Sequence, residues 1–233
     1  MTFIQADNFT AEIVRSSKRK TVSIKISKGK VFINVPNYLT HSTIESIIAK
    51  KQQWIKSKLA TQEKLASIQP KQFIINESFL YFGHHYPLNI ALGFRSSVRL
   101  ENNLLLVTVK DQHLNTPNTI KKLIIQWYRK QAEIILKEKT AYYAQLIGVN
   151  PTSMTIKTFK SRWGSCSINA GIQYNWKIIM APEAIIDYLV IHELCHIDHH
   201  NHSAVYWQTV AKFCNQYKDY GKWLKLNGAY LEL

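Results

Sequence analysis

The sequence is poor in cysteine and has no long apolar run. Its 233 residues include three cysteines, Cys166, Cys195 and Cys214, an odd number without C-x-x-C spacing. This pattern argues against a disulfide framework and a zinc ribbon, and it fits a reducing compartment. No stretch reaches the roughly 18 consecutive apolar residues of a membrane span, and the first residues contain no apolar signal region. We therefore expect a soluble, cytoplasmic protein with no membrane segment.

Acidic residues are scarce as well. The chain has 15 Asp and Glu against 30 Lys and Arg, which gives a net charge of +15. Such a charge favours anionic partners, and nucleic acid or another polyanion is one candidate. The alternative is a Lys-rich composition without a role in binding, since the basic residues are dispersed along the chain. The sequence leaves the oligomeric state open.

The sequence also lacks internal repeats, low-complexity tracts and Gly- or Ser-rich linkers. Hydrophobic residues make up 46% of the chain, which is enough for one large domain or two small ones. We expect an α+β fold with a β-rich N-terminal lobe, carrying one helix, over residues 1–110 and a second part over residues 111–233. The boundary is soft, and a single integrated domain is the alternative.

Alternating apolar and polar residues predict strands in the first part. Residues 22–27 and 31–35 flank a Lys-Gly-Lys turn and predict a β-hairpin. The adjacent His84 and His85 have no carboxylate at ligand spacing, so we interpret them as turn residues and not as a second metal site. Further short strands are expected at 73–75, 80–82, 86–92, 97–100 and 104–109.

Two helices are expected before the C-terminal third. The first is capped by Thr40 or Ser42 and runs to about residue 66, with Trp54 in the core. The second covers residues 117–147 and ends at Gly148. Its expected core side consists of Ile120, Ile124, Trp127, Ile134 and Ile135.

The pattern H-E-x-x-H stands at His192, Glu193 and His196. Pro182 and Glu183 suit the first turn of a helix, and uncharged residues surround the motif, which predicts a buried helix. Residues four apart share one helix face, so both imidazoles can reach one zinc ion. Glu193 can take the proton of a water that zinc activates. The alternative is a buried helix whose histidines only form hydrogen bonds.

Catalytic zinc needs a third protein ligand and an open position. We expect His202 in this role, in preference to His199 and His200, because the chain must leave the helix before it can bring a ring beside the metal. Asn201 can end the helix in a left-handed conformation, and Ser203 can cap a following helix. His199 or His200 then supports the other histidines or faces solvent.

A hairpin is expected just before the motif. A strand at 154–159 leads into residues 161–167, and residues 172–178 follow a turn. Because an edge strand beside the helix can accept an extended peptide, Arg162, Ser165 and Asn175 are candidates for contacting substrate or bracing the histidines.

The same hairpin allows a purely structural interpretation. Trp163 and Cys166 can pack in the core, and Arg162 can form a structural ion pair. A nucleophilic role for Cys166 is not expected, because zinc-activated water needs no protein nucleophile.

Several segments together resemble one known family. They are R-K-T-V-S-I-K-I, R-W-G-S-C-S, I-Q-Y-N-W, I-D-Y-L-V-I-H-E-L-C-H and N-H-S-A-V-Y-W, and they are similar to the YgjP-like metallopeptidase family over nearly the whole chain. The resemblance implies a zincin-like core related in its helix pattern to SprT-like proteases. It also implies that His192, His196 and His202 bind one zinc ion and that Glu193 is the general base.

The third histidine sets the motif apart from another zincin group. Metzincins have a glycine midway to the third histidine and a methionine turn downstream. Here His199 stands midway, and no methionine follows Met180. The resemblance therefore points to a different zincin subclass.

Three functions remain in competition at this point. The leading hypothesis is a zinc hydrolase, most simply a metallopeptidase acting on a peptide or protein. The second is a nucleoside triphosphate pyrophosphatase, although phosphate chemistry usually recruits Mg²⁺ and no G-x-x-x-x-G-K-[ST] segment is present. The third is a nucleic-acid-associated module with a structural zinc, against which an open coordination position argues.

Overall fold

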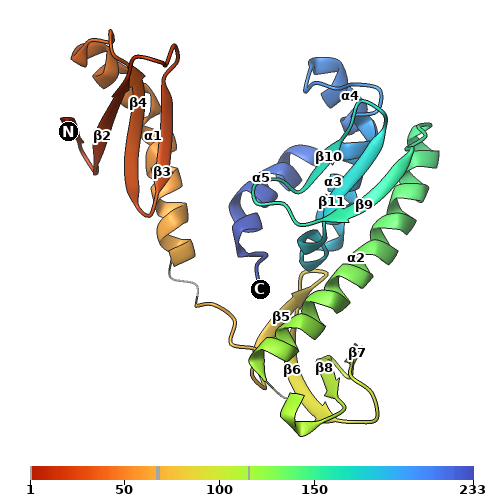
Figure 1. Ribbon diagram of the computed structural model, residues 1–233. Coiled ribbons are helices and arrows are strands. Elements are labelled where there is room, and N and C mark those ends of the chain that lie inside the picture. The colour runs from red at the N-terminus through yellow and green to blue at the C-terminus, as the bar shows by residue number, and fades with distance from the viewer. Residues whose placement is uncertain (1, 67–68, 115) are drawn as a thin grey trace. The chain divides into compact units, whose positions relative to one another are not determined.

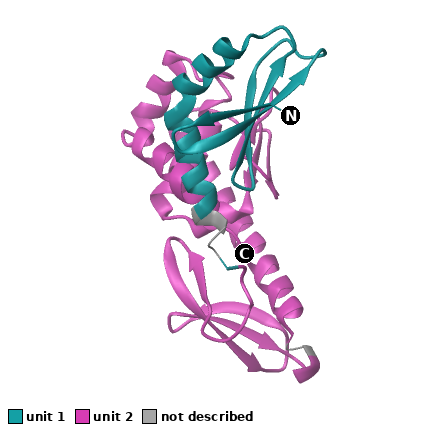
Figure 2. Ribbon diagram, turned by 90° about the vertical axis from the view of Figure 1, so that its left-hand side faces the viewer, with its two compact units in different colours: residues 1–69 teal, residues 70–233 magenta. Residues whose placement is uncertain are grey.

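The computed structural model describes residues 2–66, 69–114 and 116–233 and shows an α+β protein (Figure 1). The chain forms two compact units, Met1–Gln69 and Pro70–Leu233 (Figure 2). This division falls after Gln69, whereas the sequence suggested a soft boundary near residue 110. None of the helices in the described parts of the chain has the length and apolarity needed to cross a membrane.

The first unit is a four-stranded sheet with one helix. The predicted hairpin is confirmed, and its turn residues Lys28 and Gly29 have φ values of 50° and 72°, as a two-residue type I′ turn requires. The first strand was not predicted. The sheet has the order β1-β2-β4-β3, where β2 and β4 are parallel, with the bounds β1 (Thr2–Ala6), β2 (Phe9–Ser16), β3 (Ser23–Ser27) and β4 (Lys30–Pro36).

Helix α1 (His41–Ala66) begins after Thr40, whose hydroxyl accepts a hydrogen bond from the Thr43 backbone N–H at 3.3 Å. Its isoleucines Ile44, Ile48 and Ile55 are buried in the core that includes the sheet. The prediction that Trp54 lies in the core is wrong, because its side chain is 44% exposed. Trp54 precedes the buried Ile55 and is therefore turned about 100° away from it around the helix axis.

The second unit begins with another four-stranded sheet. Its turn residues Phe82 and Gly83 donate backbone hydrogen bonds to the carbonyl oxygens of Ile179 and Met180 at 2.9 and 3.0 Å. His84 and His85 follow this turn as the first residues of β6. The strand expected at 73–75 is absent, since Phe73 has a φ of 60°. The order is β5-β6-β8-β7, with β5 (Ser78–Tyr81), β6 (His84–Leu92), β7 (Ser97–Glu101) and β8 (Leu104–Val109).

Helix α2 (Pro117–Ile147) has the predicted bounds. Thr116 caps its start, and Gly148, with a φ of 86°, ends it in the left-handed conformation. The predicted core side was partly wrong, because Ile134 is 50% exposed. The buried residues follow a helical period and are Ile120, Ile124, Tyr128, Ala132, Leu136, Thr140 and Ala144.

The third sheet stands next to the C-terminal helices. The predicted hairpin is confirmed as β10 paired with β11, although the strand ends at Asn175 and a 3-10 helix (Trp176–Met180) replaces its expected last residues. Strand β9 pairs with β11 in parallel, which leaves β10 at the edge. The bounds are β9 (Ser153–Lys157), β10 (Gly164–Cys166) and β11 (Gly171–Asn175).

Three helices complete the unit, namely α3 (Glu183–Cys195), α4 (Ala204–Phe213) and α5 (Tyr217–Asn227). The start of α3 is fixed to α2 by Lys139, whose ammonium group donates to Asp187 at 2.7 Å and to Glu183 at 2.8 Å. Short 3-10 helices lie at Gln112–Leu114 and Gly228–Tyr230.

Candidate metal centre

Three histidine rings converge at the C-terminal end of α3. His192 lies in the last turn, His196 is the residue that ends the helix, and His202 lies in the connection to α4. Their Nε2 atoms face one another, at 3.2 Å between His196 and His202 and at 3.4 Å between His202 and His192. This is the one group of metal-ligating side chains with such geometry among the described residues.

The spacing of these nitrogen atoms fits a tetrahedral cation. Two ligands at about 2.05 Å from zinc with a tetrahedral angle between them are about 3.3 Å apart, close to the observed separations. The Nδ1 atom of His196 lies 2.9 Å from the carbonyl oxygen of His199. A carbonyl only accepts, so this Nδ1 carries the proton and Nε2 directs its lone pair to the other rings. The donor set therefore suits a metal ion.

Both helical histidines are held in the neutral form that a metal ligand needs. Burial, followed by the neighbouring His196 and His202, lowers the pKa of His192 to about 3. Burial also lowers the pKa of His196, although its hydrogen bond to His199 opposes this. Both rings are thus uncharged at neutral pH.

The chain leaves the helix earlier than the sequence suggested. Helix α3 ends at Cys195, and the expected left-handed conformation at Asn201 is not found. Instead, the Asn201 side chain accepts a hydrogen bond from the Ser203 N–H at 3.2 Å. Ser203 caps α4 as predicted, with its hydroxyl accepting from the Tyr206 N–H at 3.3 Å.

Aromatic residues of α4 hold the three rings in place. The fully buried Tyr206 stacks on His196 with 4.5 Å between ring centroids, and its hydroxyl donates to the carbonyl oxygen of His192 at 3.1 Å. Trp207 stacks on His202 at 5.3 Å. The sequence predicted a helix after Ser203 but not that its aromatic side chains pack on the histidines. The position of Tyr206 and Trp207 directly after the helix cap was the feature that could have indicated this packing.

The other histidines make separate contacts. The His199 ring lies 3.3 Å from the Thr209 hydroxyl, and His200 is exposed. His85 pairs with the Ser78 hydroxyl at 2.8 Å. The histidines outside the group of three thus have protein or solvent partners.

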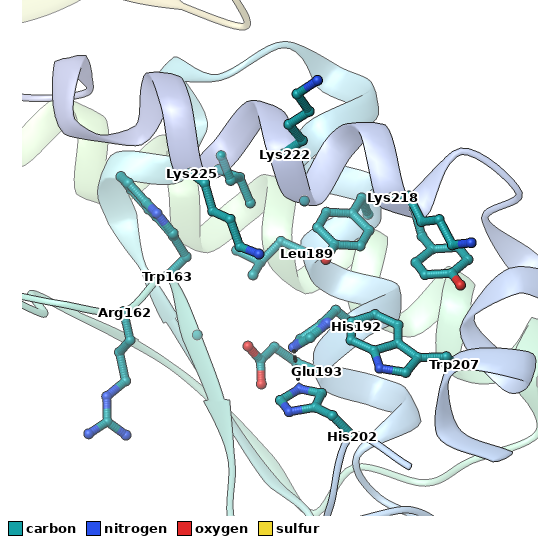
Figure 3. Close-up of a pocket in the computed structure, with 15 residues that line it drawn as sticks. Arg162, Trp163, Leu189, His192, Glu193, His202, Trp207, Lys218, Lys222 and Lys225 are labelled. Atoms are coloured by element: carbon teal, nitrogen blue, oxygen red, sulfur yellow. Dashed lines mark hydrogen bonds between the residues drawn. The ribbon is translucent and has the colours of Figure 1, made fainter. Parts of the chain in front are cut away.

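Glu193 is buried beside the group, with 4% of its surface exposed. Figure 3 shows its carboxylate next to the rings of His192 and His202. Burial raises its pKa to about 8, and the nearby positive charge of Arg162 opposes the rise. The backbone of Gly164 packs so closely on the side chain that a Cβ atom there would lie 2.5 Å from Glu193 Oε1.

The remaining candidate residues divide into two groups. Arg162 lines a cleft next to the histidines, whereas Ser165 and Asn175 do not. Asn175 is buried and donates to the carbonyl oxygens of Phe159 and Arg162 at 3.2 and 3.4 Å, so it braces the segment before β10.

The thiol of Cys166 is protonated at neutral pH. Burial, with a smaller contribution from the charge of Glu193, raises its pKa to about 11. This disfavours a nucleophilic role, in line with the expectation from the sequence.

The cleft itself has a volume of about 830 Å³. Aromatic and apolar side chains form much of its wall, and lysines of α5 form part of its rim. Its lining consists of Arg162, Trp163, Gly164, Tyr188, Leu189, His192, Glu193, His202, Trp207, Tyr217, Lys218, Gly221, Lys222, Leu224 and Lys225.

The close packing at Gly164 leads to a prediction. We expect Gly164→Ala to displace the Glu193 carboxylate and to lower turnover about 100-fold, since a misplacement of about 1 Å can have this effect. Metal content should stay at the wild-type value, because the three atoms nearest to the new methyl group all belong to Glu193 and not to a histidine. Gly171→Ala is the matched control, since its Cβ would meet only hydroxyl groups at 3.0 Å or more. Unchanged turnover in Gly164→Ala would contradict this account.

Comparison with known proteins adds to this geometry. No curated protein matches the chain. Among solved structures, the crystal structure of the metallopeptidase zymogen of Pyrococcus abyssi abylysin is similar, with 19% identity and a TM-score of 0.35, over 37% of this chain and 89% of that one. The profile of the YgjP-like metallopeptidase domain matches residues 20–227. The chain therefore belongs to the YgjP-like metallopeptidase family.

Proposed function

We propose that this protein is a zinc-dependent peptidase of the zincin type. The main support for this proposal is the convergence of three histidine Nε2 atoms beside the buried Glu193. The Nε2 atom of His202 lies 3.2 Å from that of His196 and 3.4 Å from that of His192. His192, His196 and His202 would hold one zinc ion, and three protein ligands would leave one coordination position for water or substrate. An open position is typical of catalytic zinc and not of structural zinc.

The protein supplies the proton transfer. Zinc, when bound, provides the Lewis acidity that lowers the pKa of a water from about 15.7 to about 7. Glu193 takes a proton from the attacking water, and it returns the proton to the amine nitrogen as the peptide C–N bond breaks. The burial that raises the Glu193 pKa to about 8 favours the protonated form, and the metal charge opposes this. Glu193 is thereby suited to carry a proton in both directions.

Strand β10 offers a place for the substrate backbone. It pairs with β11 on one side and is the edge of its sheet. Its first residue, Gly164, lines the cleft and packs on Glu193. An extended peptide can add to such an edge through backbone hydrogen bonds. We propose that the peptide lies along β10, with Arg162 at the start of this edge.

Metal removal and return test this function. Protein treated with a chelator should cleave no peptide of a mixed peptide library, and one equivalent of zinc should restore cleavage, as read by mass spectrometry of the fragments. Nucleoside triphosphates are assayed in parallel. Zinc-dependent release of pyrophosphate without peptide cleavage would replace the peptidase by the pyrophosphatase alternative.

The positive charge of the first unit leads to a separate prediction, namely that this unit binds nucleic acid. Residues 1–69 contain 12 Lys and Arg against 4 Asp and Glu, a net charge of +8. If this charge binds nucleic acid, the logarithm of the affinity should fall linearly with that of the salt concentration, by about 0.9 for each duplex phosphate neutralised. Fluorescence anisotropy with a labelled duplex measures this slope. If the protein does not bind the duplex at about 50 mM salt, the prediction that this charge binds nucleic acid is wrong.

A further inference from the structure

The cleft beside the histidines carries an excess of positive charge. Its lining contains four cationic side chains, Arg162, Lys218, Lys222 and Lys225, and among the described residues Glu193 is its one carboxylate. Because Glu193 is assigned to proton transfer, the cations of the lining have no other carboxylate of the described cleft as a counter-charge. A bound molecule would therefore experience a positive field.

The three lysines form a row on one face of α5. They are spaced by four and three residues, which places them on the same side of the helix over about 10 Å of its length. Gly221 lies between them, and a Cβ there would approach the Tyr188 hydroxyl oxygen of α3 to 3.0 Å. The absence of a side chain at Gly221 thus allows α5 to pack close to the helix that carries the histidines.

Within the part of the chain that the structure describes, these cations have no carboxylate partner, although Arg162 lies over the Phe159 ring at 5.5 Å and Lys218 over the Tyr217 ring at 5.8 Å. Across residues 2–66, 69–114 and 116–233, no carboxylate oxygen lies within 4.0 Å of Arg162, Lys218, Lys222 or Lys225. Elsewhere in the same unit, Lys139 and Lys177 have carboxylate partners. The lysine row is accordingly available to a ligand.

Lys225 is the member of the row nearest to the chemistry. Figure 3 shows its side chain extending from α5 toward His192 and Glu193, whereas Lys222 points away from them. The lining of the cleft also includes the apolar side chains of Trp163, Leu189 and Leu224. The cleft thus combines apolar contact surface with a positive charge directed at the reaction site.

We propose, on the basis of the peptidase function above, that the cleft selects acidic peptides and places an Asp or Glu side chain of the substrate against Lys225. A row of cations spread over about 10 Å suits the carboxylates of an extended chain, where side chains on one face repeat about every 6.8 Å. A phosphate group is instead typically held at one point by converging backbone N–H groups. The arrangement therefore favours an acidic peptide over a nucleotide.

Binding to an inactive variant separates this proposal from catalysis. Two labelled peptides of equal length, one rich in Glu and one with Gln at the same positions, are titrated by anisotropy into zinc-loaded Glu193→Gln protein. The acidic peptide should bind about tenfold more tightly at low salt, and the difference should shrink as salt is added. Adding Lys225→Glu should remove this preference. Lys212→Glu, an exposed residue of α4 outside the cleft, makes the same charge change and should preserve it.

The outcomes distinguish the two proposals. Equal binding of both peptides, no binding of either, or equal effects of Lys225→Glu and Lys212→Glu would overturn the acidic-peptide inference, whatever the wild-type protein cleaves. Selective acidic binding without any zinc-dependent cleavage would support the binding inference and contradict the peptidase function. Displacement of the acidic peptide by a nucleoside triphosphate that the wild-type protein then hydrolyses would overturn the inference in favour of a nucleotide site.

Discussion

Glu193→Gln should retain one zinc ion per chain and should lower peptide turnover by about 1,000-fold, since loss of a general base typically has an effect of 10²–10⁴. The amide has nearly the shape of the carboxylate, but it cannot accept the proton of the attacking water. The three histidines are untouched by this change. Metal content by elemental analysis and turnover of the same sample measure the two quantities together.

A matched variant on the same helix controls for the loss of charge. Glu183 of α3 is exposed and lies outside the cleft, so Glu183→Gln should leave both zinc content and turnover close to wild type. Loss of zinc from Glu193→Gln would make Glu193 a ligand and would contradict its assignment as a base.

His202→Ala should release the metal and abolish activity. The apparent free energy of zinc binding to a protein site is about 10–16 kcal/mol. If the four ligand positions contribute equally, the loss of one ligand costs roughly 3 kcal/mol, which weakens zinc affinity by more than about 100-fold. The stacking of His202 on Trp207 is lost in the same variant, but this contact is on the surface of the site. Competition with a chromophoric chelator gives the affinity.

The neighbouring histidines are the controls for this experiment. His199→Ala keeps the backbone carbonyl that accepts from His196 Nδ1, and His200 is exposed. Both alanine variants should therefore hold zinc within about tenfold of the wild-type affinity. If either variant loses zinc and His202→Ala retains it, the third ligand is His199 or His200 and not His202. This result would contradict the site described here.

Local patterns in the sequence carried the most information. The bounds of α2, its end at Gly148 and the turn at Lys28 and Gly29 follow from backbone preferences that act over a few residues. The spacing of His192 and His196 is likewise fixed by helix geometry. Such features could be predicted because neighbouring residues alone determine them.

Features that depend on distant packing could not be predicted in the same way. Trp54 and Ile134 are both exposed although they lie on amphipathic helices. Which face of such a helix is buried depends on the sheet or helix that packs against it, and that element is distant in the sequence. The strand expected at residues 73–75 is absent for a similar reason. Phe73 is buried by tertiary packing, but the segment around it is irregular. The end of the first unit at Gln69 also reflects which strands pack together.

The candidate site shows the same division between local and distant information. The motif and the resemblance suggested His192, Glu193, His196 and His202, and the structure brings these four side chains together. The packing of Gly164 on Glu193 and the lysine row of α5 join segments far apart in the sequence. No spacing rule connects these segments, so only the folded chain shows them.

X-ray absorption at the zinc K-edge of the zinc-loaded protein tests the central claim most directly. The proposed site predicts three imidazole nitrogen atoms and one further light atom at about 2.0–2.1 Å, with no sulfur ligand. A sulfur ligand at about 2.3 Å or a fourth imidazole would mean a closed site and would contradict catalysis at this centre.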